Sequence, residues 1–306
     1  MNEMRSFCAI NKRNLGLYFK DHAAVFFSLL SMLITIAIMV FFLGDLSNNA
    51  VLDTISMIPG RGGAEDVATS GKIVFYWISA GILTINAATV THAFYSNMIK
   101  DRTGSTLNSL FVMPIKRPVF VMGYVSGAWI AGCIMSLVTL IVVEAIGYAK
   151  GYGIPAAAVQ VKMILLIALI NFVFAAVLFL FASMVKSASA WSGIGIVLGT
   201  LAGFLGGIYF PLGQMSETLA KIVKCFPFIY GTSVFRKVIL ADIEDGFFGE
   251  APEIMRSEFD KAMGMDFTLF KNELSVGGKI GILVAVGLIF SVLATLYLTY
   301  SKKKDR

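Results

Sequence analysis

Charged residues are scarce in this sequence of 306 residues, of which only 14% are Asp, Glu, Lys or Arg. An ordinary soluble domain carries roughly 25% charged residues. A large core does not explain the deficit, because a globule of this size still needs a polar surface. Hydrophobic residues make up 57% of the chain, and the mean hydropathy is +0.80. The composition therefore indicates an integral membrane protein.

Cysteine and histidine are also rare, which bears on redox and metal chemistry. Cys8, Cys133 and Cys225 form an odd set on separate parts of the chain, which argues against a disulfide framework. The two histidines, His22 and His92, lie far apart, and the sequence has neither a C-x-x-C motif nor a Cys/His cluster. We therefore expect no metal site.

Motifs for catalysis and nucleotide binding are missing as well. The sequence contains no nucleophile elbow and no H-E-x-x-H motif. The fragments nearest to a phosphate-binding loop, Gly71-Lys72-Ile73 and Gly278-Lys279-Ile280, lack both the Ser/Thr and the earlier glycine. We expect no catalytic residues, no cofactor bound by this chain and no enzymatic activity of its own.

Long apolar runs dominate what is present. A membrane-spanning helix needs about 20 apolar residues, and six stretches qualify. They predict an all-α polytopic membrane protein that forms a single transmembrane domain over residues 1–306. The charged residues before the first run, with no cleavage site after a short apolar stretch, predict that this run is retained. The predicted spans are residues 23–43, 73–95, 119–146, 161–185, 190–210 and 277–299.

Basic residues between these runs predict the orientation. With six crossings, the basic segments all fall on one side of the membrane: Lys12, Arg13 and Lys20; Lys100, Arg102, Lys116 and Arg117; Lys186; Lys302, Lys303, Lys304 and Arg306. The positive-inside rule then places both termini in the cytoplasm of a plasma-membrane protein. The net charge of +6 is accordingly a topology signal, and we expect the lipid bilayer rather than nucleic acid as a partner.

Three segments lie outside the spans. Residues 4–22 alternate apolar and basic side chains at helical spacing, which predicts an interfacial helix, with a merely basic tail as the alternative. Residues 101–114 lie in a cytoplasmic loop closed by prolines, which predicts a short rigid helix. Residues 212–275 begin with broken apolar pieces, which predict short re-entrant outer helices. Their second half, 241–275, predicts an acidic external loop with one helix at Pro252–Met263.

Glycines recur in the fifth predicted span. Gly195, Gly199, Gly203 and Gly207 are spaced by four, which would place all four on one helix face where another backbone can approach closely. The spacing leaves open whether the partner is a span of this chain or a second copy. Isolated polar residues within the spans, Asn86, His92 and Asn171, predict interhelical hydrogen bonds.

Three stretches carry a resemblance to a known family. They are KRNLGLYFKDHAAVFFSLL at Lys12–Leu30; Asp101-Arg102-x-Gly104-x-x-Leu107-Asn108-x-Leu110 with Met113-Pro114 and Arg117-Pro118; and Gly206 to Leu212 followed by Leu219, Ile222, Pro227 and Tyr230. In this order and spacing, they resemble the permease subunit of an ATP-binding-cassette exporter of the type-2 ABC transmembrane family. Asn108 departs from the pattern, because the family usually has Glu there.

The resemblance implies roles for these stretches. Residues 101–114 would be a coupling helix that docks on a separate ATPase subunit, which would bind ATP and Mg²⁺. A second permease, identical or related, would pair through the first and fifth spans and face the glycine row. The residues implied in coupling are Asp101, Arg102, Gly104, Leu107, Asn108, Leu110 and Pro114. The residues implied in an outer gate are Phe210, Pro211, Phe226, Pro227 and Tyr230.

The function implied is ATP-driven export, in a bacterial cell, of a hydrophobic or amphipathic substrate such as a drug, an antimicrobial peptide or a lipid-like molecule. Two alternatives remain at this stage. One is a membrane sensor or immunity protein that binds a ligand through residues 212–275. The other is a secondary transporter, which inverted repeats or intramembrane coupling charges would favour.

Overall fold

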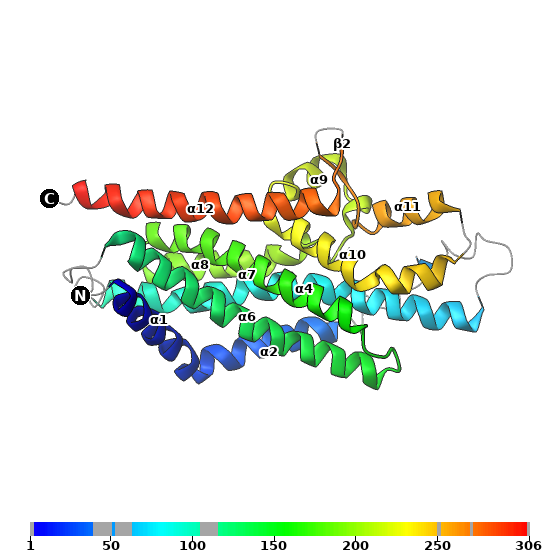
Figure 1. The fold of residues 1–306 in the computed structure, drawn as a ribbon, viewed down its shortest axis with the longest axis horizontal. Helices are drawn as coiled ribbons and strands as arrows, with labels where there is room; N and C mark the ends of the chain where they lie inside the picture. The colour runs from blue at the N-terminus through cyan, green and yellow to red at the C-terminus, as the bar shows by residue number, and fades with distance from the viewer. Residues whose placement is uncertain are drawn as a thin grey trace.

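Helix α4, Ala64–Thr103, is the central element of the computed structural model (Figure 1). The structure describes residues 3–38, 51–52, 63–104, 116–249, 252–269 and 272–304. The 40 residues of α4 contain no proline. At 1.5 Å per residue the helix is about 60 Å long, roughly twice the thickness of the hydrocarbon core of a bilayer. Part of α4 therefore extends beyond the hydrocarbon core of a bilayer.

Helix α4 is one of thirteen described elements. The others are α1 (Glu3–Lys20), α2 (His22–Ile38), α6 (Arg117–Ala149), α7 (Ala157–Met184), α8 (Ala188–Leu205), η2 (Leu212–Gln214), α9 (Glu217–Val223), α10 (Pro227–Phe248), α11 (Glu253–Ala262), β1 (Thr268–Leu269), β2 (Asn272–Glu273) and α12 (Val276–Lys304). The two strands form one antiparallel pair, with Thr268 opposite Glu273. Both described ends of the chain lie at the same end of the bundle (Figure 1).

The protein is mostly helical and has five to six candidate spans. Five described helices, α4, α6, α7, α8 and α12, are long and apolar enough to cross a membrane. The bent pair of α1 and α2 would be the sixth. Helix α2 covers most of the first predicted span, 23–43, whose last residues lie outside the described part of the chain. The chain is therefore a polytopic membrane protein.

The largest difference from the sequence prediction is helix α10. Short re-entrant helices and an acidic loop are predicted for residues 212–275, but α10 alone has 22 residues. It packs along the N-terminal half of α4, where Gly231 sits against Thr84. Its buried apolar residues, such as Phe228 and Phe235, belong to the main hydrophobic core. This burial stabilises a long helix that the mixed polarity of the sequence obscures. The predicted short helix after Pro252 is present as α11.

Helix α1 lies against α6 at the end of the bundle that holds both termini. Its buried residues recur every four positions at Ser6, Ile10, Asn14 and Tyr18. The close approach depends on Gly123 of α6, where a Cβ would lie 2.9 Å from Ile10 Cγ2. The apolar residues that predict the interfacial helix divide between the two sides, because Met4 is exposed whereas Tyr18 is fully buried. One face of α1 is therefore fixed to the bundle and the other is free to meet lipid.

Helices α8 and α12 are the least buried of the candidate spans. Only 17% of the apolar window of each is buried, against 89% for α4. On α8 the exposed side chains include Ile196, Val197 and Leu201. Exposed apolar faces of this kind are covered by lipid or by another protein.

Candidate functional site

The C-terminal end of α4 is tied to the interfacial helix by an ion pair. Arg13 of α1 donates two parallel hydrogen bonds, each 2.8 Å long, to the two carboxylate oxygens of Asp101. The Tyr124 hydroxyl of α6 lies 3.5 Å from the same carboxylate. A bidentate guanidinium–carboxylate pair fixes orientation as well as distance. Asp101, a residue predicted for coupling, thus connects α1, α4 and α6.

Arg102, the next residue, ties the same end of α4 to α7. Its guanidinium donates to the carbonyl oxygens of Ala182, Ser183 and Val185, of which the Ser183 bond is 3.0 Å. These carbonyls end α7 and have no partner within the helix, so a cation there is doubly favourable. Together, Arg13, Asp101, Arg102 and the last carbonyls of α7 form what we call the α1–α4–α7 junction.

The predicted coupling residues divide at Gly104, which caps the C-terminus of α4. Asp101 and Arg102 belong to the last turn of α4 rather than to a separate short helix, because nothing in the sequence breaks the helix before Gly104. Four further predicted residues, Leu107, Asn108, Leu110 and Pro114, lie outside the described residues. The described coupling residues thus lie at the N-terminal start of the predicted segment 101–114.

The glycine row does not form one uninterrupted helix face. Helix α8 ends at Leu205, and Gly207 lies beyond it with a φ of +63°. The N–H of Gly207 bonds the Phe204 carbonyl and the N–H of Ile208 bonds that of Gly203, the two hydrogen bonds of a Schellman cap. Gly207 therefore terminates α8, and the prediction that it shares one helix face with the other three glycines is wrong. The spacing of four carries no sign of this change of role.

The three glycines within α8 have different surroundings. A Cβ at Gly195 would lie 2.5 Å from the His92 ring of α4, and one at Gly203 would lie 2.3 Å from the Tyr209 ring. Around Gly199 there is open space. Gly195 and Gly203 thus serve packing within the chain, whereas Gly199 opens onto the outward surface.

We expect Gly195→Ala to lower the free energy of unfolding by about 1–3 kcal/mol, because the His92 ring cannot move aside. The ring is stacked on Trp191 at 4.4 Å, and its Nε2 lies 3.0 Å from the Trp191 carbonyl oxygen. Thermal unfolding in detergent measures the effect. Gly199→Ala is the matched control and should leave the monomer as stable as before. Equal losses in both variants would contradict the packing role of Gly195.

The residues predicted for an outer gate surround the two turns that follow α8. Phe210 is exposed and its ring lies 6.1 Å from that of Phe204, while Pro211 begins η2. Phe226 and Pro227 begin α10. Tyr230 is buried, and its hydroxyl donates to the Lys224 carbonyl. This hydroxyl closes the turn between α9 and α10.

Arg236 is a central residue of this region that the sequence does not single out. Its side chain is fully buried and stacks on Trp77 of α4, with the guanidinium carbon 3.6 Å from the ring centroid. It donates to the carbonyl oxygens of Trp77, Met263 and Gly207. One guanidinium therefore joins α4, the turn after α8, α10 and the segment after α11.

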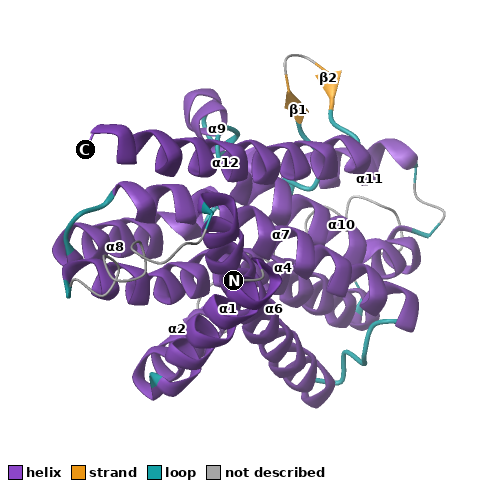
Figure 2. Cartoon of the chain, turned by 60° about the vertical axis from the view of Figure 1, so that its left-hand side comes forward, coloured by secondary structure: helices purple, strands orange, loops and turns teal. Residues whose placement is uncertain are grey.

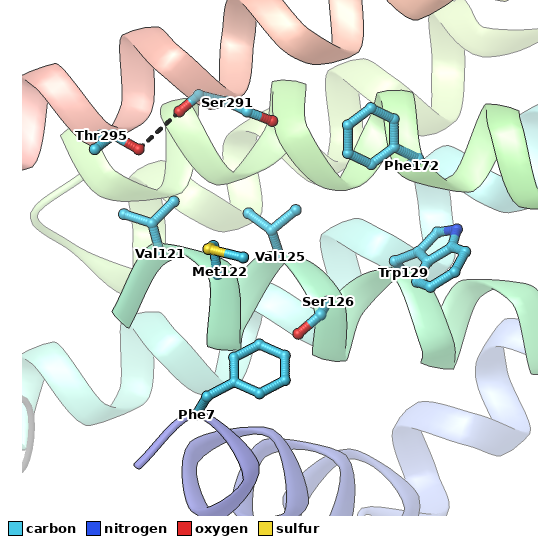
Figure 3. A pocket seen from close by; sticks show the side chains of 9 residues that line it. All are labelled: Phe7, Val121, Met122, Val125, Ser126, Trp129, Phe172, Ser291 and Thr295. Carbon is cyan, nitrogen blue, oxygen red and sulfur yellow. Dashed lines mark hydrogen bonds between the residues drawn. The ribbon is translucent and has the colours of Figure 1, made fainter. Parts of the chain in front are cut away.

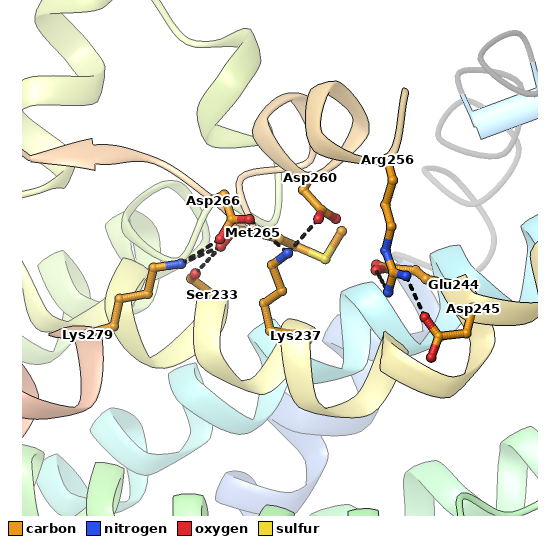
Figure 4. Close-up of polar contacts among 9 residues, drawn as sticks. All are labelled: Ser233, Lys237, Glu244, Asp245, Arg256, Asp260, Met265, Asp266 and Lys279. Atoms are coloured by element: carbon orange, nitrogen blue, oxygen red, sulfur yellow. Dashed lines mark hydrogen bonds and ion pairs between the residues drawn. The ribbon is translucent and has the colours of Figure 1, made fainter. Parts of the chain in front are cut away.

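Charged side chains gather where α10 meets α11 and the start of α12 (Figure 4). Lys237 is paired with Asp260 and with Asp266, the latter at 2.8 Å. Buried Lys279 approaches Asp266 from the other side at 3.1 Å. The separate acidic and basic residues are visible in the sequence, but their meeting depends on the long α10. We call this set, together with Glu244, Asp245 and Arg256, the outer charged cluster.

Within the outer charged cluster, Glu244 is only 1% exposed, and burial raises the pKa of its carboxyl to about 8. Nearby Asp260 raises this pKa further, while Lys237 and Arg256 oppose the shift. In an unfolded chain the pKa of Glu is about 4.3. Between these values the folded protein keeps a proton that the unfolded chain releases, so stability falls as pH rises.

We therefore expect the unfolding temperature of the protein to decrease as the pH is raised from about 5 to about 9. The Glu244→Gln variant should lose the contribution of Glu244 to this pH dependence, because an amide does not titrate. Thermal unfolding at several pH values measures it, with Asp242→Asn on the exposed side of α10 as the control. A Glu244→Gln variant with the pH slope of the wild type would contradict the assignment.

The polar residues predicted to link spans do so. Asn86 of α4 donates to Thr139 of α6 at 2.7 Å, and Asn171 of α7 donates to Ser136 of α6 at 3.0 Å. His92 links α4 to α8 as described above. Among the described residues, no group of three or more His, Cys, Asp or Glu side chains is placed to hold a metal ion.

The sequence profile of the ABC-2 family transporter proteins matches residues 63–296. The chain belongs to this family. The matched range includes Asp101, Arg102 and Arg236, but it begins after α1 and α2. No curated protein matches the chain significantly. As an ABC-2 permease the protein is a membrane subunit of an ABC transporter, and permeases of this family have no ATPase site of their own.

Family membership gives the α1–α4–α7 junction its significance. An ABC-2 permease in general works with an ATP-binding subunit. Arg13 lies outside the matched range, whereas Asp101 and Arg102 lie inside it. The ion pair therefore connects the N-terminal helix of this permease to the region that defines its family.

Proposed function

We propose that this ABC-2 permease is the membrane-spanning half of an exporter that moves a hydrophobic or amphipathic substrate outward across the plasma membrane of a bacterial cell. A separate ATPase subunit binds ATP and Mg²⁺ and docks on residues 101–114. Both termini lie in the cytoplasm. The family match and the concentration of basic residues around the junction support this arrangement.

The observation that carries the proposal is the α1–α4–α7 junction. A motor outside the membrane needs a stiff element at the membrane face. Asp101 and Arg102 are the first residues of the segment proposed to contact the motor, and their bonds hold three helices. The exposed pairs Lys100–Asp21 and Lys116–Glu3 lie nearby but contribute little, because water screens them. Displacement of residues 101–114 would thus move α1, α4 and α7 together.

A second permease copy covers the outward face of α8 in this proposal. Exposed Ile196, Val197 and Leu201 on this helix need an apolar partner, and open space at Gly199 permits close approach. Helix α2, which the resemblance implicates in the same pairing, also exposes large apolar residues such as Phe26 and Phe27. Figure 2 shows α2 and α8 toward the same side of the bundle.

An apolar groove supports a substrate with a hydrocarbon part (Figure 3). It has a volume of about 340 Å³ and lies between α1, α6, α7 and α12. The hydroxyls of Ser126, Ser291 and Thr295 line it, but each donates to a carbonyl of its own helix. The lining therefore offers few free donors, and it suits an acyl chain or the apolar part of a drug or peptide. The lining residues are Phe7, Val121, Met122, Val125, Ser126, Trp129, Phe172, Ser291 and Thr295.

Co-purification tests the proposal. The permease, expressed with a candidate soluble ATPase of the ATP-binding-cassette type, should yield a stable complex that hydrolyses ATP and exports a lipophilic dye from membrane vesicles. The double variant Leu107→Asp/Leu110→Asp should lose the complex, because two carboxylates would replace the proposed apolar contact. A permease that binds no ATPase, or a double variant with unchanged assembly and export, would overturn the proposal.

A further inference from the structure

The outer charged cluster borders a polar cavity at the end of the molecule opposite to both described termini (Figures 1 and 4). The cavity has a volume of about 700 Å³, which is within the size range of sites for small organic molecules. Its lining comes from α10, α11 and the segment that follows α11. The lining residues are Lys237, Asp245, Phe248, Gly249, Glu253, Arg256, Ser257, Asp260 and Asp266. The groove proposed for a hydrocarbon substrate shares none of these residues.

Two buried carboxylates at this cavity each keep one oxygen without a hydrogen-bond partner among the described residues. Asp260 lines the cavity and is 4% exposed; one of its oxygens binds Lys237, and Oδ1 has no partner. Glu244 stands behind the lining with Oε2 3.4 Å from Arg256, and its Oε1 has no partner. A buried acceptor without a partner costs free energy, roughly 1–3 kcal/mol for a polar group and more for a charged one. A small rotation of the Asp260 carboxylate, which lines the cavity, would let a donor within the cavity bind Oδ1 and remove this cost.

The charge of the lining selects the kind of donor. Four carboxylates, of Asp245, Glu253, Asp260 and Asp266, face two cations, Lys237 and Arg256, which leaves a formal charge of −2. Behind the lining, Lys279 adds one positive charge, while Glu244, whose raised pKa keeps its carboxyl mostly protonated at neutral pH, adds little, so the net charge stays negative. An anionic ligand would therefore be repelled, and a ligand with more than one positive charge would be favoured.

The arrangement suits an organic cation better than a metal ion. In the described part of the chain, no three acidic, histidine or cysteine side chains converge at metal-binding distance. The acidic groups instead form two sets, with Asp260 and Asp266 on Lys237, and Glu244 and Asp245 on Arg256. Figure 4 shows Asp260 and Arg256 reaching from α11 toward Lys237, Glu244 and Asp245 on α10. Acceptors spaced in this way match ammonium groups separated by an alkyl chain.

We propose that this cavity is a binding site for a small organic polycation, whose ammonium groups bind Asp260 and the carboxylates at the rim of the cavity. The site lies far from the α1–α4–α7 junction along α4, and the proposal does not depend on the direction of transport or on the ATPase partner. It assigns to the α10–α11 region a ligand-binding role beyond that of a transport path.

Spermidine is the probe for this site. The purified full chain, reconstituted in lipid nanodiscs, should bind spermidine saturably in isothermal titration calorimetry. Asp260→Asn should weaken binding at least tenfold, because it removes the charge at the buried acceptor. Asp245→Asn at the exposed rim should weaken binding about threefold. Asp242→Asn makes the same change on the same helix, outside the cavity, and should bind as the wild type does.

Folding is separated from binding by measuring the thermal unfolding of each variant without spermidine. Asp245 is 64% exposed at its side chain, so its variant should fold even if Asp260→Asn does not. Absence of saturable binding, or wild-type binding by both cavity variants, would overturn the proposal. Binding of Ca²⁺ alone that Asp260→Asn abolishes would also overturn it in favour of a metal site.

Discussion

Replacement of Arg236 by methionine is expected to lower the free energy of unfolding by about 2–4 kcal/mol, the largest effect of any single substitution considered for this permease. Methionine can fill much of the volume but cannot donate hydrogen bonds. The carbonyl oxygen of Gly207 would lose its donor in a buried site, that of Met263 would keep only the indole N–H of Trp77, and the contact with the face of Trp77 would lose its charge. Thermal unfolding of the purified chain measures the loss.

Two companion variants sharpen this result. Arg236→Lys keeps the charge but loses the planar fork that reaches three carbonyls, so it should fall between the wild type and Arg236→Met. Lys221→Met removes one exposed partner of an i,i+4 pair on α9 and should change stability by less than about 0.5 kcal/mol. If Arg236→Met were no more harmful than Lys221→Met, the joining role of Arg236 would be wrong.

Exchange of the charges of the Arg13–Asp101 pair should reveal whether the α1–α4–α7 junction transmits force. We expect Arg13→Asp and Asp101→Arg each to lower dye export about tenfold while the ATPase subunit remains bound. Each variant places two like charges in contact and releases α1 from α4. The double exchange restores opposite charges and should recover a large part of export, with a coupling energy of about 1–3 kcal/mol. Export and ATP hydrolysis are measured on the same vesicles.

The ratio of export to ATP hydrolysis distinguishes coupling from folding. A folding defect would lower both rates together, whereas a broken junction should lower export and leave hydrolysis. Lys100→Met, which removes the exposed partner of Asp21, serves as the matched control in the same turn of α4. A double exchange no better than the single variants would mean that the two residues do not act as a pair.

The membrane class of this chain follows from composition alone, because no water-exposed globule could carry so few charges. The hydrogen bonds of Asn86 and Asn171 were equally predictable, since a polar side chain in an apolar run has few partners except other helices. Helix α10 was not predictable in this way. Its charged residues suggest an exterior loop, and only packing against α4 reveals which of its faces is buried.

In the candidate sites, local sequence motifs identify some residues but not the distant residues that they contact. Asp101 and Arg102 could be singled out from a local motif, but their partners lie 88 positions earlier and more than 80 positions later in the chain. Gly207 belongs to the glycine row by spacing alone, and only its positive φ reveals that it ends the helix. Arg236 resembles an ordinary surface base in the sequence, because no local pattern shows that Trp77 and three carbonyls surround it.

The length of α4 makes it a lever arm. A rod of about 60 Å that tilts by about 5° moves its far end by roughly 5 Å, as much as one turn of a helix. The α1–α4–α7 junction holds the C-terminal end of α4, and Arg236 of α10 holds α4 at Trp77. If α4 turns about the contact between Arg236 and Trp77, a displacement imposed at Asp101 would reach Ala64 at roughly half its size, because Trp77 lies about 36 Å from Asp101 and about 20 Å from Ala64 along the helix. The position of Trp77 along α4 would then set how such a displacement is divided between the two sides of the membrane.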